Sequence, residues 1–333
     1  MEKLYCQTNW PQQNIELKNF IPELFSLETG LEEVIKTGDD TICAMCQTLL
    51  KSGGKRLRPL LVILCGKAVN PKNTASLIKA GMAVELIHMA SLVHDDIIDQ
   101  SYYRRGKPTL NSSWGEKQAV LAGDFLFAQA FDLLAAQELS PVLKIMVKTI
   151  SDMCIGEIDQ LNQAYNPNLT ERDYFTRIEK KTAKLLSSSC LAGALIAGAN
   201  QETLRSLEIY GMNLGYAFQI TDDLLDYTGE SSVMGKPAGQ DLASGNLTLP
   251  MIYLLRHPKE GSWVKNIIAQ KQLDSYHLEK ILSLLKETGL LEQSYCVAQQ
   301  CGSIAKNRLT AIPPGKYRDL LEYLVDKALE RSN

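Results

Sequence analysis

Helical periodicity covers most of the chain, whereas patterns typical of β-strands are scarce. Apolar residues recur at helical spacing in five long segments, at 74–101, 118–137, 141–164, 170–199 and 201–228. Shorter helical segments lie at 58–69, 273–287, 290–305 and 315–331, and loop composition marks 102–113, 165–169 and 229–250. No run alternates between apolar and polar residues as a half-buried strand does. We therefore predict an all-α protein with a single domain.

Charge and cysteine content exclude several other classes of protein. Lys+Arg 35 against Asp+Glu 38 gives a formal net charge of −3, which argues against a nucleic-acid partner. The longest clean apolar stretch, 190–199, is too short to cross a membrane, and the N-terminus lacks the apolar core of a signal peptide. We expect a cytoplasmic protein without a membrane span. Cys43 and Cys46 form an isolated C-x-x-C pair, which favours buried helix thiols over a redox or metal site.

Two acidic motifs of the same form, DDIID at 95–99 and DDLLD at 222–226, end apolar helical runs. Residues at i and i+4 share a helix face, whereas the second residue of each motif is turned about 100° away. One such motif could be a solvated helix face, but stacked carboxylates in apolar surroundings need a compensating cation. Hard oxygen ligands without a Cys or His cluster favour Mg²⁺ bound together with phosphate oxygens. The stacked pairs are Asp95 with Asp99 and Asp222 with Asp226, supported by Asp96 and Asp223.

Basic residues flank both acidic motifs. GGKRLRP at 53–59 places three cations beside two glycines, and RRGK at 104–107 follows the first acidic motif. Lys180, Lys181 and Lys236 lie on either side of the second. A run of charge alone is more often a solvated surface. Guanidinium and ammonium groups that bracket Mg²⁺-binding carboxylates, however, suit the recognition of a diphosphate.

Seven motifs, in chain order, resemble the trans-isoprenyl diphosphate synthase (polyprenyl synthetase) family. They are GGKRLRP at 53–59, HMASLVHDDIID at 88–99, RRGKPT at 104–109, AGDFLF at 122–127, KTAKLL at 181–186, FQITDDLLDYTG at 218–229 and MGKPAGQDLASGNLTLP at 234–250. The resemblance extends over roughly residues 40–331. It is strongest to the catalytic large subunit of bacterial two-component hexaprenyl or heptaprenyl diphosphate synthases. It implies one domain over 1–333, with about 40 peripheral N-terminal residues and C-terminal helices at 270–331.

The resemblance implies the isoprenoid synthase fold, a barrel of antiparallel helices around a deep apolar cavity with an aspartate motif on each side of its mouth. The implied reaction is Mg²⁺-dependent head-to-tail condensation of an allylic diphosphate, farnesyl or geranylgeranyl diphosphate, with isopentenyl diphosphate. Three Mg²⁺ ions per active site are expected. The leaving diphosphate requires charge neutralisation, and the allylic cation left behind must be kept from water.

The matched motifs also imply a role for each site residue. Asp95, Asp99 and Asp222 are expected to bind Mg²⁺, with Asp96, Asp223 and Asp226 in support. Isopentenyl diphosphate is assigned to Lys55, Arg58, His88 and Arg105, and the allylic diphosphate to Arg104, Lys181 and Lys236. Thr182 and Gln219 are expected to face the developing cation. His88 lies seven residues before Asp95, nearly two helical turns, and therefore on the same helix face.

Product length in the family depends on bulk at the fifth and fourth positions before the first aspartate motif, here Ala90 and Ser91. Both are small, so the cavity is expected to continue toward Ile87, Leu86 and Ala83 on the turns below. We therefore favour a product of C30–C35. The alternative is a larger side chain from another helix that closes the cavity, which would make the chain a short-chain geranylgeranyl or farnesyl diphosphate synthase.

Two further alternatives and the state of assembly complete the sequence-based interpretation. A terpene cyclase also uses DDxxD but does not need Lys55, Arg58 and Arg105, and a non-catalytic regulatory subunit tends to lose its aspartate motifs. Gln240 departs from the Lys of many relatives, which weakens a diphosphate contact there alone. We expect a homodimer, or a heterodimer with a small regulatory subunit, and a lipophilic product that is delivered to a membrane.

Overall fold

The computed structural model describes residues 21–104, 106–228 and 239–330. The chain divides into two compact units, one formed by residues up to 63 together with 74–134, and the other by 64–73 together with 135 onward. Each unit has its own set of helices, and one helix, α4 (Leu57–Val69), begins in the first unit and ends in the second. The single domain predicted over 1–333 stays a prediction.

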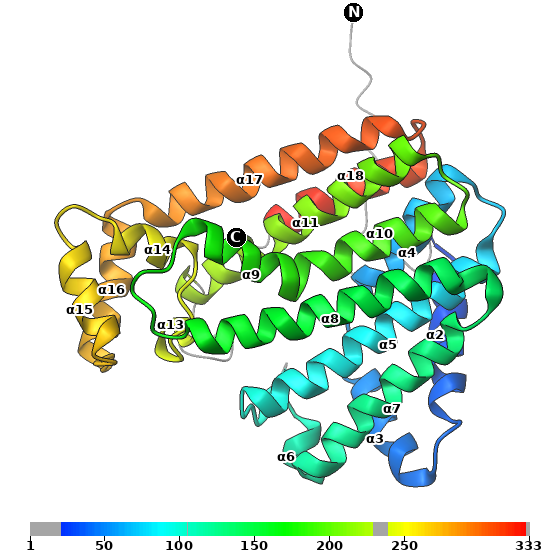
Figure 1. Cartoon of the computed structure of the whole chain (residues 1–333), viewed down its shortest axis with the longest axis horizontal. Coiled ribbons are helices and arrows are strands. Elements are labelled where there is room, and N and C mark those ends of the chain that lie inside the picture. Colours follow the sequence, from blue (N-terminus) through cyan, green and yellow to red (C-terminus); the bar gives the residue numbers. More distant parts are fainter. Residues whose placement is uncertain (1–20, 105, 229–238, 331–333) are drawn as a thin grey trace, which may run out of the picture. The chain divides into compact units, whose positions relative to one another are not determined.

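The described part of the first unit consists of helices, their connections and one short hairpin, and Figure 1 shows the helices. Its elements are α2 (Glu23–Ile35), α3 (Asp40–Lys51), α5 (Thr74–Ile98), β1 (Tyr103–Arg104), β2 (Lys107–Pro108), α6 (Leu110–Trp114) and α7 (Glu116–Leu134). Helix α5 packs along α7 and also contacts α2. The side chain of Asp39 caps α3 by accepting a hydrogen bond from the backbone N–H of Ile42, as expected for an acidic N-cap.

The second unit is built around α11 (Gln201–Thr228), which packs against α10 (Lys184–Ile196) and α17 (Leu290–Arg308) (Figure 1). Its other elements are η1 (Gln137–Leu139), α8 (Ser140–Gln163), α9 (Glu171–Ile178), η2 (Glu179–Ala183), α13 (Gln240–Ala243), α14 (Leu249–Leu255), α15 (Gly261–Ala269), α16 (Ser275–Glu287), η3 (Leu309–Ala311) and α18 (Lys316–Leu329). Thr170 and Asp173 form a capping box that starts α9. Buried Tyr210 donates its hydroxyl to the carbonyl of Leu321 and so holds α18 against α11.

The all-α prediction is confirmed, although α2, α3 and α15 lie outside the predicted helical segments and other segments differ locally. The segment 102–113, predicted as a loop, contains the β1–β2 hairpin, in which Tyr103 pairs with Pro108. The helix predicted over 170–199 is interrupted by η2, a π-helical turn. The loop predicted over 229–250 includes the short helix α13 and the start of α14. These features depend on neighbouring elements, which sequence periodicity does not report.

Among the described helices, α5 alone is long and apolar enough by itself to cross a membrane, and α7 and η1–α8 pass the same test only as a pair bent by 103°. The most apolar stretch of α5 is 67% buried inside the protein. The core helix of a globular protein meets the same test of length and composition, and the carboxylates of Asp95 and Asp96 lie near the end of α5. We therefore describe α5 as a core helix.

The first aspartate motif ends in a tight helix C-cap. The backbone N–H of Ser101 donates to the carbonyl of Asp96 at 2.8 Å, and that of Gln100 donates to Ile97 at 3.1 Å. This pair of bonds defines a Schellman motif, which requires a left-handed residue at the position of Gln100. Its φ is +50°, a conformation that costs a non-glycine residue free energy. The end of the helix that carries the motif is therefore fixed by a strained residue.

Replacing Gln100 with glycine is expected to stabilise the protein by about 0.5–1 kcal/mol, because relief of the left-handed strain exceeds the entropy that glycine adds to the unfolded chain. Chemical denaturation measures the change. The matched control, Gln300→Gly at an exposed position inside α17, should destabilise by about 1 kcal/mol. Loss of stability in both variants would contradict the strain argument.

Candidate active site

The first aspartate motif lies on the last turn of α5. The N–H of Asp99 still donates to the carbonyl of Asp95 at 2.8 Å, so the helical turn continues one residue beyond α5 and stacks these two aspartates as predicted. Asp96 turns inward and is 4% exposed. Its Oδ1 accepts a hydrogen bond from Nε of Arg104 on β1 at 2.8 Å. Asp96 therefore braces the turn, and the hairpin positions Arg104 beside it.

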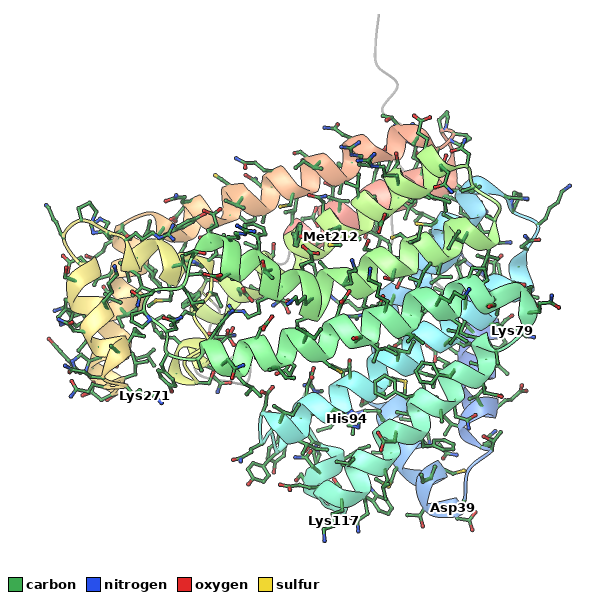
Figure 2. All side chains as sticks on the ribbon, viewed as in Figure 1. Asp39, Lys79, His94, Lys117, Met212 and Lys271 are labelled. Carbon is green, nitrogen blue, oxygen red and sulfur yellow. The ribbon has the colours of Figure 1, made fainter. Side chains whose placement is uncertain are left out.

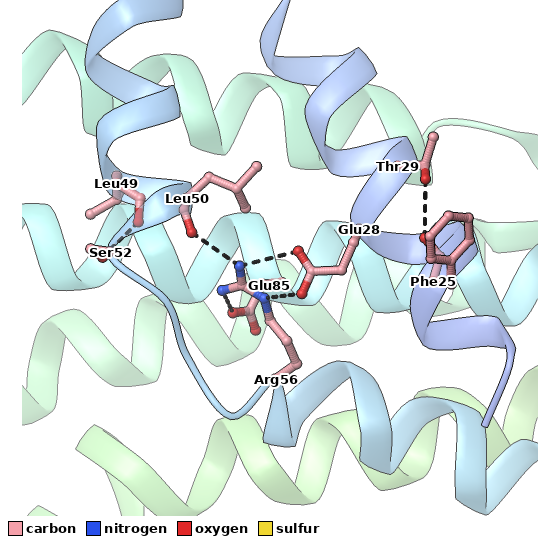
Figure 3. Close-up of polar contacts among 8 residues, drawn as sticks. All are labelled: Phe25, Glu28, Thr29, Leu49, Leu50, Ser52, Arg56 and Glu85. Carbon is pink, nitrogen blue, oxygen red and sulfur yellow. Dashed lines mark hydrogen bonds and ion pairs between the residues drawn. The ribbon is translucent and has the colours of Figure 1, made fainter. Parts of the chain in front are cut away.

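The GGKRLRP segment separates its three cations between surface and core, and Figure 3 shows the contacts of the buried one, Arg56. Arg56 is 8% exposed and forms ion pairs with Glu28 on α2 at 3.0 Å and Glu85 on α5 at 2.9 Å. It also donates to the carbonyl of Leu50 at the end of α3. Burial disfavours the charge, but the bonds and charges of the two glutamates outweigh it and hold the pKa of Arg56 above its ordinary value. Arg56 is thus a structural anchor.

The ion pair of Arg56 with Glu85 holds Lys55 and Arg58 near His88, three of the residues predicted to bind isopentenyl diphosphate. Lys55 is exposed and Arg58 half-buried, one and two residues from the anchor. Glu85 lies three residues before half-buried His88, about one turn along the same helix. The Arg56–Glu85 ion pair therefore joins the GGKRLRP segment to α5 next to His88. Arg105, assigned to the same substrate, lies outside the described residues.

The AGDFLF motif of α7 packs against the first aspartate motif. Gly123 faces His94, which is labelled in Figure 2, and a Cβ at Gly123 would lie 2.2 Å from the Nε2 atom of that ring. The same Nε2 lies 3.2 Å from the carbonyl oxygen of Val120 and 3.7 Å from Oδ1 of Asp124. Because only glycine leaves room for the imidazole ring, the AGDFLF motif packs closely against α5 at His94, the residue immediately before Asp95.

The second aspartate motif holds a buried hydrogen-bonded chain. Asp222 is exposed, whereas Asp223 is 5% exposed and accepts hydrogen bonds from the Tyr174 hydroxyl at 2.6 Å and the Gln219 amide at 2.7 Å. Gln219 Oε1 in turn accepts from the Thr182 hydroxyl at 2.7 Å. Burial and the nearby charge of Asp241 raise the pKa of Asp223 to about 7, although the bonds from Tyr174 and Gln219 act in the opposite direction.

Asp226 contacts the segment that follows α11. Its carboxylate accepts the backbone N–H groups of Gln240 and Asp241 at 3.2 and 3.0 Å, and its carbonyl accepts that of Gly239. At Gln240, the position that departs from the family pattern, the backbone therefore makes the contact. Lys236 lies outside the described residues.

The π turn η2 presents Lys181 and Thr182. Nζ of Lys181 lies 2.7 Å from Oε2 of Glu157 on α8, whose side chain is 11% exposed. Lys180, on the same turn, pairs with Asp159 at 2.7 Å. Thr182 and Gln219 thus come together with Asp223 in the second unit, and Lys181 precedes Thr182 on the same turn and pairs with Glu157.

The predicted chain-length residues lie on α5 below the first aspartate motif. Ala90 and Ile87 are fully buried, and half-buried Ser91 donates its hydroxyl to the carbonyl of His88 at 2.9 Å. Ser91 and Asp95 are separated by one helical turn and share a face. The side chains about one turn before the motif, Ala90 and Ser91, are therefore small, and Ile87 about one turn further down is larger.

The donor set of both aspartate motifs fits Mg²⁺. No group of three His, Cys, Asp or Glu side chains in the described part of the chain could hold an ion by itself. Mg²⁺ typically needs only one or two protein carboxylates, because waters and substrate phosphate oxygens complete its octahedral shell. The stacked pair Asp95 and Asp99 and the exposed Asp222 are residues of this kind. Cys43 and Cys46 are free thiols on α3; Cys46 is buried, which raises its pKa to about 12, whereas Cys43 is only half-buried.

Known proteins match this arrangement over most of the chain. Residues 39–285 match the family model of polyprenyl synthetase. Heptaprenyl diphosphate synthase component 2 of Geobacillus stearothermophilus is 37% identical over 304 residues, which cover 91% of this chain and 93% of the relative. The chain belongs to the polyprenyl synthetase family. It is therefore a trans-prenyltransferase, as predicted from the motifs.

Solved structures agree with this family assignment. The crystal structure of heptaprenyl diphosphate synthase from Staphylococcus aureus has a TM-score of 0.88 and 34% identity, covering 94% of this chain and 98% of its own. Geranylgeranyl pyrophosphate synthase from Lactobacillus brevis has a TM-score of 0.87 and 30% identity, covering 95% and 99%. The predicted isoprenoid synthase fold is confirmed. Since synthases of different product length match almost equally well, the fold of a polyprenyl synthetase does not fix that length.

Sequence reasoning missed several residues that shape the site of this polyprenyl synthetase. Glu85, Glu157 and Tyr174 were not singled out, although each contacts or adjoins a predicted site residue. Glu85 gave a signal, because it is a lone carboxylate inside the apolar run AVELIHM. A charge in such a run needs a buried partner, which Arg56 supplies.

Proposed function

We propose that this enzyme condenses farnesyl or geranylgeranyl diphosphate with isopentenyl diphosphate to form an all-trans polyprenyl diphosphate of C30–C35. The observation that carries the proposal is the set of two intact aspartate turns combined with a GGKRLRP segment anchored beside His88. Ala90 and Ser91 support the length, because neither carries the large side chain that limits chain growth at these positions in the family. Relatives named heptaprenyl diphosphate synthase support it independently.

The carboxylates of Asp95, Asp99 and Asp222 are the proposed Mg²⁺ ligands, with Asp96, Asp223 and Asp226 in support. Mg²⁺, with three ions per site expected, supplies neutralisation of the charge on the leaving diphosphate. Lys55, Arg58, His88 and Arg105 hold isopentenyl diphosphate in this proposal, and Arg104, Lys181 and Lys236 hold the allylic diphosphate. The Asp96–Arg104 and Glu157–Lys181 ion pairs orient two of these cations before a substrate arrives.

The buried chain in the second unit determines which way the Thr182 hydroxyl points. When Asp223 is ionised it only accepts hydrogen bonds, so the Gln219 amide then turns its NH₂ toward Asp223 and its carbonyl toward Thr182. Thr182 then donates its proton to Gln219. The hydroxyl lone pairs that remain are free to face a cation, which is the proposed role of Thr182 and Gln219 toward the allylic intermediate.

A partner subunit is part of the proposal. The name of the Geobacillus relative, component 2, supports a heterodimer with a small subunit, and a homodimer is the alternative. Helix α8 carries the exposed side chains Val147, Ile155, Ile158 and Leu161, which an apolar partner surface would cover. We propose that the enzyme is cytoplasmic and that its lipophilic product is delivered to a membrane.

Product analysis tests the proposed function. The purified chain is incubated with Mg²⁺, farnesyl diphosphate and labelled isopentenyl diphosphate, and the products are sized by thin-layer chromatography and mass spectrometry. Products of C30 or longer support the proposal and show that the chain works alone. Products that stop at C15 or C20 would replace it with the short-chain alternative. A folded chain without turnover is then assayed with the small subunit of a two-component synthase, and continued inactivity would contradict the proposal.

The substitution Ser91→Phe is expected to shorten the main product to C20 or less. A phenyl ring one turn below Asp95 occupies the space into which the growing chain must pass, while half-buried Ser91 tolerates added volume better than Ala90. The control Ser303→Phe adds the same ring to an exposed position of α17 and should leave product length unchanged. An unchanged product from Ser91→Phe would place the floor elsewhere.

A further inference from the structure

The π turn η2 is enclosed by two glycines from two different helices. A Cβ at Gly156 on α8 would lie 2.8 Å from Cβ of Lys180 and 3.1 Å from the backbone nitrogen of Lys181. On α11, a Cβ at Gly215 would lie 2.4 Å from Cα of Ala183. Real Cβ atoms do not approach other atoms so closely, so both positions require the absence of a side chain. The turn is thus packed directly against the backbones of α8 and α11.

A π turn needs such room because it holds one residue more than an α-helical turn. The N–H of Lys184 donates to the carbonyl of Glu179, five residues back, and the extra residue widens the turn. It also shifts every following side chain by about 100° around the helix axis. In a regular α-helix over the same residues, Lys181 and Thr182 could not both keep their present contacts with neighbouring helices.

The helices that supply the glycines also supply the polar partners of the turn. Glu157, next to Gly156 on α8, pairs with Lys181, and Gln219, one turn after Gly215 on α11, accepts the Thr182 hydroxyl. Oε1 of Glu157 is buried without a hydrogen-bond partner in the described part of the protein, so this side chain is held by its bond to Lys181 through Oε2. Glycine packing at Lys181 and Ala183 and side-chain bonding at Lys181 and Thr182 therefore hold the π turn from both sides.

We propose that Gly156 and Gly215 are positioning residues for prenyl transfer, because they hold the π turn that presents Lys181 to the allylic diphosphate and Thr182 to the allylic cation. This inference rests on the roles proposed above for Lys181 and Thr182. The inference adds that the rate of prenyl transfer depends on the backbone conformation of the π turn as well as on its side chains. An added methyl group at either glycine moves the turn, and displacement of reacting groups by about 1 Å can cost about a hundredfold in rate.

The substitution Gly215→Ala tests the proposal against Gly211→Ala, a control one turn earlier on the same helix. At Gly211 an added Cβ would lie 2.6 Å from Cα of Ser187, a contact as tight, but against the regular helix α10. Both variants should lose similar stability in thermal unfolding. Below both melting temperatures, Gly215→Ala should lower kcat tenfold to a hundredfold without changing KM for isopentenyl diphosphate. Gly211→Ala should stay within threefold of the parent enzyme.

The outcomes separate this inference from the proposed function. An unmodified enzyme that forms no polyprenyl diphosphate, alone or with a small subunit, contradicts the function itself. An active parent whose Gly215→Ala and Gly211→Ala variants lose the same activity overturns the positioning role. If Gly215→Ala does not fold, Gly156→Ala is decisive, since its added methyl would lie 2.8 Å from Cβ of Lys180 and no closer than 3.1 Å to the backbone of the turn, a looser contact than at Gly215. Its kcat should fall at least fivefold with an unchanged KM for isopentenyl diphosphate, and a smaller loss overturns the proposal.

Discussion

Asp95→Asn is expected to lower kcat about a thousandfold. The substitution keeps the size of the side chain but removes a negative charge that, stacked with Asp99 on the same helical turn, is part of the proposed Mg²⁺ site. Loss of Mg²⁺-dependent charge stabilisation of several kcal/mol corresponds to a factor of this size. Steady-state assays with farnesyl and isopentenyl diphosphate measure it. The Mg²⁺ concentration needed for half-maximal activity should also rise, and chelation by EDTA should abolish the activity of the parent enzyme.

The control for this effect is Asp132→Asn, which neutralises an exposed aspartate of α7 outside both motifs. Its kcat and its Mg²⁺ dependence should match those of the parent. Circular dichroism and thermal unfolding establish that both variants are folded. A drop of less than about tenfold for Asp95→Asn, with unaltered Mg²⁺ dependence, would exclude this carboxylate as a metal ligand.

Arg56→Met is expected to lower the free energy of unfolding by about 3–5 kcal/mol. Methionine fills much of the space of the Arg56 stem, but it leaves the buried carboxylate of Glu85 and the half-buried carboxylate of Glu28 without their shared cation. Removing one partner of a buried ion pair costs this much because the other charge stays desolvated. Urea denaturation measures the change. Adding Glu85→Gln to Arg56→Met should recover part of the loss, since one stranded charge is then removed.

Arg318→Met provides the comparison on the surface. Arg318 pairs with Glu322 at 3.1 Å across one turn of α18, and both side chains are partly exposed to solvent. Such pairs contribute less than about 1 kcal/mol, so this variant should be nearly as stable as the parent. Equal effects at Arg56 and Arg318 would show that the buried cluster does not anchor the GGKRLRP segment.

Both experiments separate features that look alike in sequence. Lys55, Arg56 and Arg58 form one run of cations, yet only Arg56 is buried, and its partners lie 28 and 29 residues away in the chain. The aspartate motifs also contain residues of one type in different surroundings, because the second aspartate of each motif is buried. Asp96 meets Arg104 eight residues later, whereas Asp223 meets Tyr174, which is 49 residues distant.

The amino-acid sequence alone determined the all-α fold and the aspartate turns, because helical periodicity and i, i+4 stacking arise within a few residues of chain. Its motifs, in their order, also indicated the family. The tertiary structure decided the rest: that Arg56 is an anchor, that Gln219 and Thr182 form a chain with Asp223, and that residues 179–183 form a π turn. Each of these depends on close packing and on polar partners from distant segments, and a buried charge or a widened helical turn is stable only where such neighbours accommodate it.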